Sequence, residues 1–120
     1  VNNNAAGLFA GNNVIGSNNI ASGTNAGQNI TANYTIAVGT SSSASTDYSI
    51  AIGTGAIASG NQSISIGYKN IVSGNHSGAI GDPTVVSGDS SYSVGNDNSV
   101  ATNDTFVLGN SVTSSVANSV

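Results

Sequence analysis

The sequence of 120 residues has no cysteine and very few charges. Without cysteine, neither a disulfide nor a thiolate metal site is available. Lys69 is the only cation beside five aspartates, and the net charge is −4. Nucleic acids and anionic membrane surfaces are therefore disfavoured as partners, because binding to phosphates requires several Lys and Arg side chains.

Long hydrophobic segments and targeting signals are also missing. No apolar run approaches the roughly 20 residues of a membrane-spanning helix, and no signal peptide is recognisable. The chain starts within a pattern, at Val1-Asn2-Asn3-Asn4, as a fragment of a longer protein would. Few charges with much Asn, Ser and Gly are typical of disordered chains. Here, however, the apolar residues keep a fixed phase, which disordered sequences lack.

The chain does contain a regular repeat. A glycine, here called the anchor, recurs every fourteen residues, at Gly39, Gly53, Gly67, Gly81, Gly95 and Gly109. Each anchor follows a short segment in which small and apolar residues alternate, as in Ser49-Ile50-Ala51-Ile52, and this alternation predicts a β-strand. A second, weaker strand follows each anchor, so one unit holds two strands and two tight turns.

Strands this short cannot pair within one unit, so each is expected to pair with the same strand in the next copy. The sequence therefore predicts an all-β parallel β-roll, a solenoid of 14-residue coils with two facing sheets. We expect the large apolar residues of the first strand to point inward, with a gap at Gly78, while Ser49, Ser63 and Ser91 point outward. The inward set is Ile36, Val38, Ile50, Ile52, Ile64, Ile66, Ile80, Tyr92, Val94, Phe106 and Leu108. The second strand should contribute Ile30, Ala44, Ala58, Val72, Val86 and Val100.

The remaining side chains of the first strand predict an interface between copies. Because the core of such a roll would be thin, an outward stripe of small, uncharged residues is expected to pack against other copies. This expected interface between copies consists of Ala37, Ala51, Ser65, Ala79, Ser93 and Val107.

One repeat family predicts one domain, residues 1–120. Residues 34–109 form the regular array, and residues 110–120 begin a further coil. Residues 1–33 are degenerate: Gly11 lies two periods before Gly39, whereas Gly16 is out of phase. We therefore expect one shortened or looped coil in this part.

Residues with distinctive chemistry are sparse. His76 is the only histidine, and no acid partner or pocket is evident, so no enzyme activity is expected. The aspartates are isolated, and neither a calcium-roll motif nor a P-loop lysine occurs, so no metal and no cofactor are expected. Tyr68, Lys69, His76 and Asp82 form a candidate ligand surface, although ordinary solvated turn residues would look the same.

Two segments carry a family resemblance. Ser-Ile-Ala-Ile-Gly at 49–53 with Gly-Ala-Ile-Ala-Ser-Gly at 55–60, and Asn-Asp-Thr-Phe-Val-Leu-Gly-Asn at 103–110, resemble the YadA-like head repeat of trimeric autotransporter adhesins. Clear matches cover 34–120, and residues 1–23 match only loosely. The resemblance implies a left-handed β-roll, a homotrimer, and a head displayed on the bacterial cell surface. Outer-membrane anchoring would then come from a stalk and anchor absent from this sequence.

For function, the resemblance implies adhesion to a host receptor, to extracellular matrix proteins or to other bacteria, and hence a role in virulence. The low charge disfavours collagen as the ligand. The alternative is a structural spacer in a surface fibre that binds no ligand itself. An ice-binding solenoid is disfavoured, because no regular outward Thr-x-Thr ladder is present.

Overall fold

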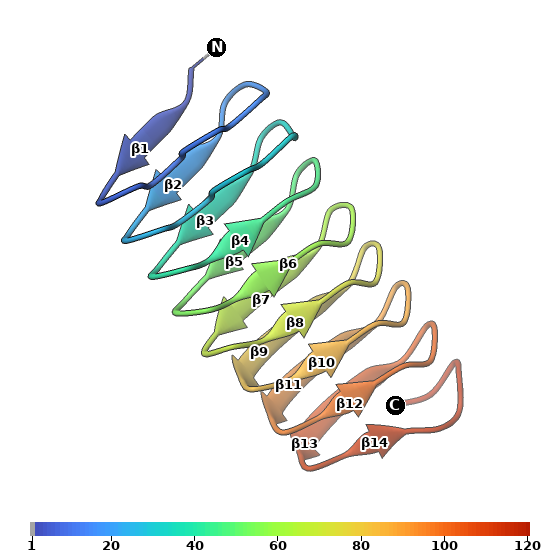
Figure 1. Ribbon diagram of the computed structural model, residues 1–120. Helices are drawn as coiled ribbons and strands as arrows, with labels where there is room; N and C mark the ends of the chain where they lie inside the picture. Colours follow the sequence, from blue (N-terminus) through green and yellow to red (C-terminus); the bar gives the residue numbers. More distant parts are fainter. Residues whose placement is uncertain (1) are drawn as a thin grey trace.

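The alternating segments form short strands that stack into an elongated solenoid, shown in Figure 1. The structure is a computed structural model that describes residues 2–120, and its principal extents are 41 × 20 × 14 Å. All strand pairs are parallel, and the described residues contain no helix. The predicted all-β parallel solenoid is therefore confirmed.

The larger sheet contains the strand that precedes each anchor glycine. Its order is β1 (Asn4–Ala6), β2 (Ile20–Ser22), β3 (Ile36–Val38), β5 (Ile50–Ile52), β7 (Ile64–Gly67), β9 (Gly78–Asp82), β11 (Tyr92–Asn96) and β13 (Phe106–Asn110). Equivalent residues of successive coils pair in register, for example Ile36 with Ile50 and Gly95 with Gly109. The fourteen-residue period of the sequence is therefore the period of the coils from β3 onwards.

The smaller sheet consists of two-residue strands. These are β4 (Ser43–Ala44), β6 (Ile57–Ala58), β8 (Ile71–Val72), β10 (Val85–Val86), β12 (Ser99–Val100) and β14 (Thr113–Ser114). Each connects to the larger sheet by a turn at either end, and these turns form two edges along the solenoid (Figure 1).

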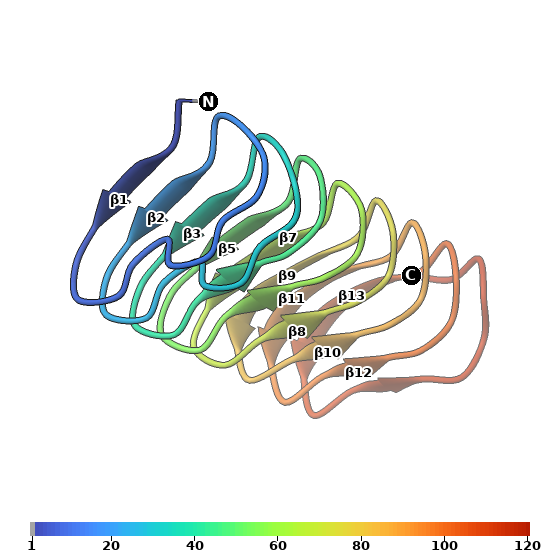
Figure 2. The same cartoon turned by 45° about the horizontal axis from the view of Figure 1, so that its top comes forward.

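The first coils are longer than the others. Asn4 pairs with Ile20, and Ile20 pairs with Ile36, so the period here is sixteen residues. The glycines in register with Gly39 are therefore Gly7 and Gly23, not Gly11. Of the two expected alternatives, a shortened coil is wrong, since these coils are two residues longer than the others. Residues 24–29 form successive turns where later coils have a strand of the smaller sheet. Figure 2 shows the resulting extra bend in the blue coils.

The anchor position requires glycine because successive coils approach closely there. Gly39 has φ +123°, and a Cβ on it would lie 2.6 Å from the carbonyl carbon of Gly53 in the next coil. A left-handed φ is costly for residues with a side chain. Gly109, in the last coil, has neither the positive φ nor a following anchor, and a Cβ on it would meet only Val112.

The interior holds the opposite face of the larger sheet from the one we expected. Ser49, Ser63 and Ser91 are fully buried within one chain, whereas Ile80 is 50% and Leu108 75% exposed. The other residues of the expected inward set are half-buried or exposed: Ile36, Val38, Ile50, Ile52, Ile64, Ile66, Tyr92, Val94 and Phe106. The predicted facing of this strand is therefore wrong, whereas all six residues predicted inward from the second strand are buried.

The close approach of the two sheets explains this inversion. Between them lies a cluster of fully buried alanines: Ala37, Ala44, Ala51, Ala56 and Ala58. Spaces filled by methyl groups have no room for isoleucine, which is left on the outside. The hydroxyl groups of Ser49 and Ser91 are accommodated inside because the turns supply acceptors, whereas the buried Ser63 Oγ has no hydrogen-bond partner among residues 2–120. The Ser49 Oγ donates to the Thr46 carbonyl at 2.6 Å, and the Ser91 Oγ donates to the Thr102 carbonyl at 2.8 Å.

Buried asparagines close the turns after the anchors. The Asn70 Nδ2 donates to the carbonyls of Ile66 and Gly81, both at 2.8 Å, and its Oδ1 accepts from the Thr84 backbone N–H. Asn98, which lies two coils after Asn70, donates in the same way to the Gly109 carbonyl. Each of these side chains links two coils while satisfying groups that burial would otherwise leave unpaired.

Candidate interaction surfaces

The outward side chains of the larger sheet form a continuous apolar face. They form two columns along the solenoid, and no residue in these two columns carries a charge. The first column is Ile20, Ile36, Ile50, Ile64, Gly78, Tyr92 and Phe106. The second column begins with the polar Ser22 and continues with Val38, Ile52, Ile66, Ile80, Val94 and Leu108. Exposed apolar surface on this scale marks a contact site in soluble proteins.

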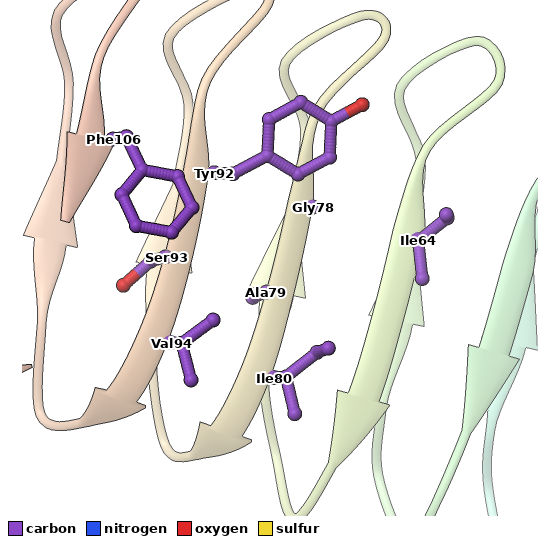
Figure 3. Close-up of a pocket in the computed structure, with 8 residues that line it drawn as sticks. All are labelled: Ile64, Gly78, Ala79, Ile80, Tyr92, Ser93, Val94 and Phe106. Atoms are coloured by element: carbon purple, nitrogen blue, oxygen red, sulfur yellow. The ribbon is translucent and has the colours of Figure 1, made fainter. Parts of the chain in front are cut away.

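A hollow of about 220 Å³ interrupts this apolar face at Gly78 (Figure 3). Ile64, Ile80, Val94 and the aromatic rings of Tyr92 and Phe106 surround it, together with Gly78, Ala79 and Ser93. The Tyr92 ring lies over Gly78, where an added Cβ would come within 2.8 Å of the Tyr92 Cδ1. The gap expected in the core at Gly78 is therefore on the outer face instead.

The stripe predicted as the trimer interface lies inside the roll. Ala37, Ala51, Ser65, Ala79 and Ser93 are at most 1% exposed, and Val107 is 7% exposed. These side chains fill the space between the two sheets, so another copy cannot reach them while the coil stays closed. This correction follows from the inverted facing of the strand, and the surface left for contact is the apolar face.

The structure brings together three of the four residues of the candidate ligand surface. Tyr68 and Lys69 form the turn between β7 and β8, and the Lys69 Nζ lies 5.0 Å from the centroid of the Tyr68 ring. The Tyr68 N–H donates to the Gly81 carbonyl, which places Asp82 beside it in the next coil. His76 lies at the other edge, between β8 and β9, and does not share this surface.

The edge that carries His76 was not singled out by sequence reasoning. We call it the return edge, since its turns lead from the smaller sheet back to the larger one. Tyr34 and Tyr48 stack there, with ring centroids 5.1 Å apart and planes 3° apart. Their spacing of fourteen residues at the same position of the repeat is the signal that could have predicted this stack.

A ladder of Asn and Asp side chains accompanies the tyrosines on the return edge. The Asp47 Oδ1 accepts from the Asn33 backbone N–H at 2.7 Å, and the Asp89 Oδ1 accepts likewise from Asn75. Asn75 in turn accepts from the Asn61 backbone N–H. Each side chain therefore fixes the turn of the preceding coil.

Neither a metal-binding cluster nor a membrane helix is present in residues 2–120. No group of three or more His, Asp or Glu side chains comes together there. No helix in this part of the chain could cross a membrane.

In-register parallel coils define a β-solenoid, a repeat architecture in which each coil contacts its neighbours along one axis. The family model of the YadA head domain repeat matches this chain twice, at residues 31–56 and 58–82. Residues 31–82 therefore carry YadA-like head repeats, of the kind found in trimeric autotransporter adhesins. This family is a structural adhesin domain that forms trimers and is not known for enzymatic activity. No curated protein matches the chain.

Proposed function

We propose that residues 1–120 form one trimeric head that attaches a bacterium to a host receptor, to extracellular matrix proteins or to other bacteria. In this proposal the head acts without catalysis, metal or cofactor. It is displayed at the cell surface by stalk and outer-membrane anchor segments outside this sequence. The observation that supports the proposal most directly is the apolar face of the larger sheet.

The apolar face supports a closed assembly of identical copies. Its two columns extend along the long axis of the solenoid, so copies aligned with that axis can bury them coil against coil. Adhesin heads of this family are trimers, and three-fold closure would cover the same face on every copy. The core of one chain consists largely of alanine, serine and valine. Burial of the outer isoleucines would therefore add much of the hydrophobic stabilisation, at about 25 cal/mol per Å².

A charged substitution on the apolar face tests this assembly. Ile50→Asp should convert the trimer into monomers, because burial of an unpaired carboxylate in an apolar contact is costly. The control is Ile71→Asp, since Ile71 is 41% exposed on the outer side of the smaller sheet. Light scattering coupled to size exclusion gives the mass, and circular dichroism checks that both variants keep β-structure. A wild-type monomer at micromolar concentration, or a trimer unaffected by Ile50→Asp, would exclude this interface.

Adhesion itself is tested with the trimer. We expect labelled wild-type protein to bind to at least one of a panel of host cells and matrix proteins. The Ile50→Asp monomer should bind more weakly, because a trimer presents each site three times and gains by avidity. A trimer that binds to none of these targets would favour the alternative, a spacer that holds other domains away from the cell.

A further inference from the structure

The return edge carries two aromatic rings that the fold itself does not need. Tyr34 and Tyr48 have φ of +58° and +60°, a conformation that bulky residues rarely adopt. The same position in later coils holds Gln62, His76 and Ser90, which have similar φ values. Both rings remain about half exposed, at 52% and 54%, so they add little to the core.

Stacking on each other offsets part of this unfavourable backbone conformation, since an aromatic pair contributes about 0.5–1.5 kcal/mol. It also holds both rings in a fixed orientation at the surface. Exposed tyrosines that are already ordered lose little conformational entropy on binding, which is why tyrosine is frequent in contact sites.

Beside the rings lies a carboxylate with a free oxygen. The Asp47 Oδ1 accepts hydrogen bonds from Asn33, whereas its Oδ2 has no hydrogen-bond partner among residues 2–120. Asp47 directly precedes Tyr48 in the chain and lies one coil after Asn33. The free oxygen is therefore part of the same turn as the stacked rings.

Charge is distributed unequally between the two edges. Lys69, the only cation in the sequence, lies at the opposite edge and contacts Tyr68. The return edge carries Asp47, Asp89 and Asp104 without any Lys or Arg. Its charge is therefore complementary to a cationic group, and the rings add an aromatic surface that favours a guanidinium over an ammonium group.

We propose that Tyr34, Tyr48 and Asp47 form a contact site for an arginine side chain of a protein partner. The guanidinium would pack on the tyrosine pair and donate a hydrogen bond to the free oxygen of Asp47. This site deepens the proposed adhesin function, on which it rests, by naming the chemistry of the partner. It does not require the trimer, because all three residues belong to one chain.

The probe is a short peptide of alternating glycine and arginine, compared with the same peptide carrying glutamate. Titration followed by nuclear magnetic resonance should shift the backbone amides of residues 33–34 and 47–48 with the arginine peptide only. Tyr48→Ala should weaken binding about fivefold, corresponding to a cation–π contact of about 1 kcal/mol at an exposed site. Tyr48→Phe should bind as the wild type does.

Asp47→Asn is the second variant, and it preserves the fold because Asn61 and Asn75 occupy this ladder position in other coils. It should weaken binding severalfold and reduce the dependence on salt. The matched controls are Asp97→Asn and Tyr68→Ala at the opposite edge. They should change neither the affinity for the arginine peptide nor its dependence on salt.

Equal binding of the glutamate peptide, or equal weakening by Asp47→Asn and Asp97→Asn, would overturn the site in favour of unspecific attraction by net charge. Loss of the trimer in Tyr48→Ala would also overturn it, since the edge would then belong to a subunit contact. Light scattering on each variant separates this failure from a failure of the proposed trimer.

Discussion

Replacing one buried alanine by a larger residue tests which face of the larger sheet lies inside the roll. Ala51 is fully buried among Ala37, Ala44, Ala56 and Ala58. In Ala51→Leu, three additional carbon atoms enter a space that methyl groups already fill. Overpacking of this kind costs about 1–3 kcal/mol where the surroundings can shift. Here both neighbouring coils restrain the strand, so we expect a loss at the upper end of that range.

The matched control makes the same change at the surface. Ala101 is exposed on the smaller-sheet side, and Ala101→Leu should alter the free energy of unfolding by no more than about 0.5 kcal/mol. Urea unfolding of both variants, at one fixed protein concentration, measures the difference. A typical domain is stable by about 5–15 kcal/mol, so a loss near 3 kcal/mol would be readily visible. If Ala51→Leu were as stable as the wild type, Ala51 would face outward and the observed interior would be wrong.

Three further outcomes are expected. Gly53→Ala should lower the free energy of unfolding by about 2 kcal/mol or more, because φ is +124° and the new Cβ would lie 2.7 Å from the Gly67 carbonyl carbon; thermal unfolding measures this, and an unchanged melting temperature would contradict it. Asn70→Leu should cost about 1–3 kcal/mol, since the buried N–H of Thr84 loses its partner and the Gly81 carbonyl keeps only the Tyr68 N–H; urea unfolding that shows less than about 0.5 kcal/mol would refute this. The apparent melting temperature should rise with protein concentration if association through the apolar face stabilises the fold, and a constant value would argue for an independently stable monomer.

The pairing of the strands could be read from the sequence. A period of fourteen residues with a glycine at one fixed position leaves only coil-to-coil pairing for strands of two to five residues. The second strand was also placed correctly, because it has only one column of residues that is consistently small and apolar. This column includes Ala44, Val72 and Val86, all of which are fully buried.

The N-terminal coils could not be read by the same rule. An insertion of two residues per coil moves the anchors to Gly7 and Gly23. In a region rich in glycine, Gly11 and Gly16 fit a search for anchors equally well. Only the pairing of Asn4 with Ile20, and of Ile20 with Ile36, decides between them. In the same way, only the fold separates His76 from Tyr68 and joins Tyr34 to Tyr48 at one edge.

The sequence by itself determined the parallel solenoid, its period and the residues that share each face of a strand. Only the tertiary structure decided which face is inside. A period of two is unchanged when the strand is turned over, so the pattern allows both arrangements. Hydrophobicity favours isoleucine inside, but the distance between the sheets favours alanine, and turns that accept the Ser49 hydroxyl settle the competition. The isoleucines are thereby left on an outer face, where a single chain cannot bury them.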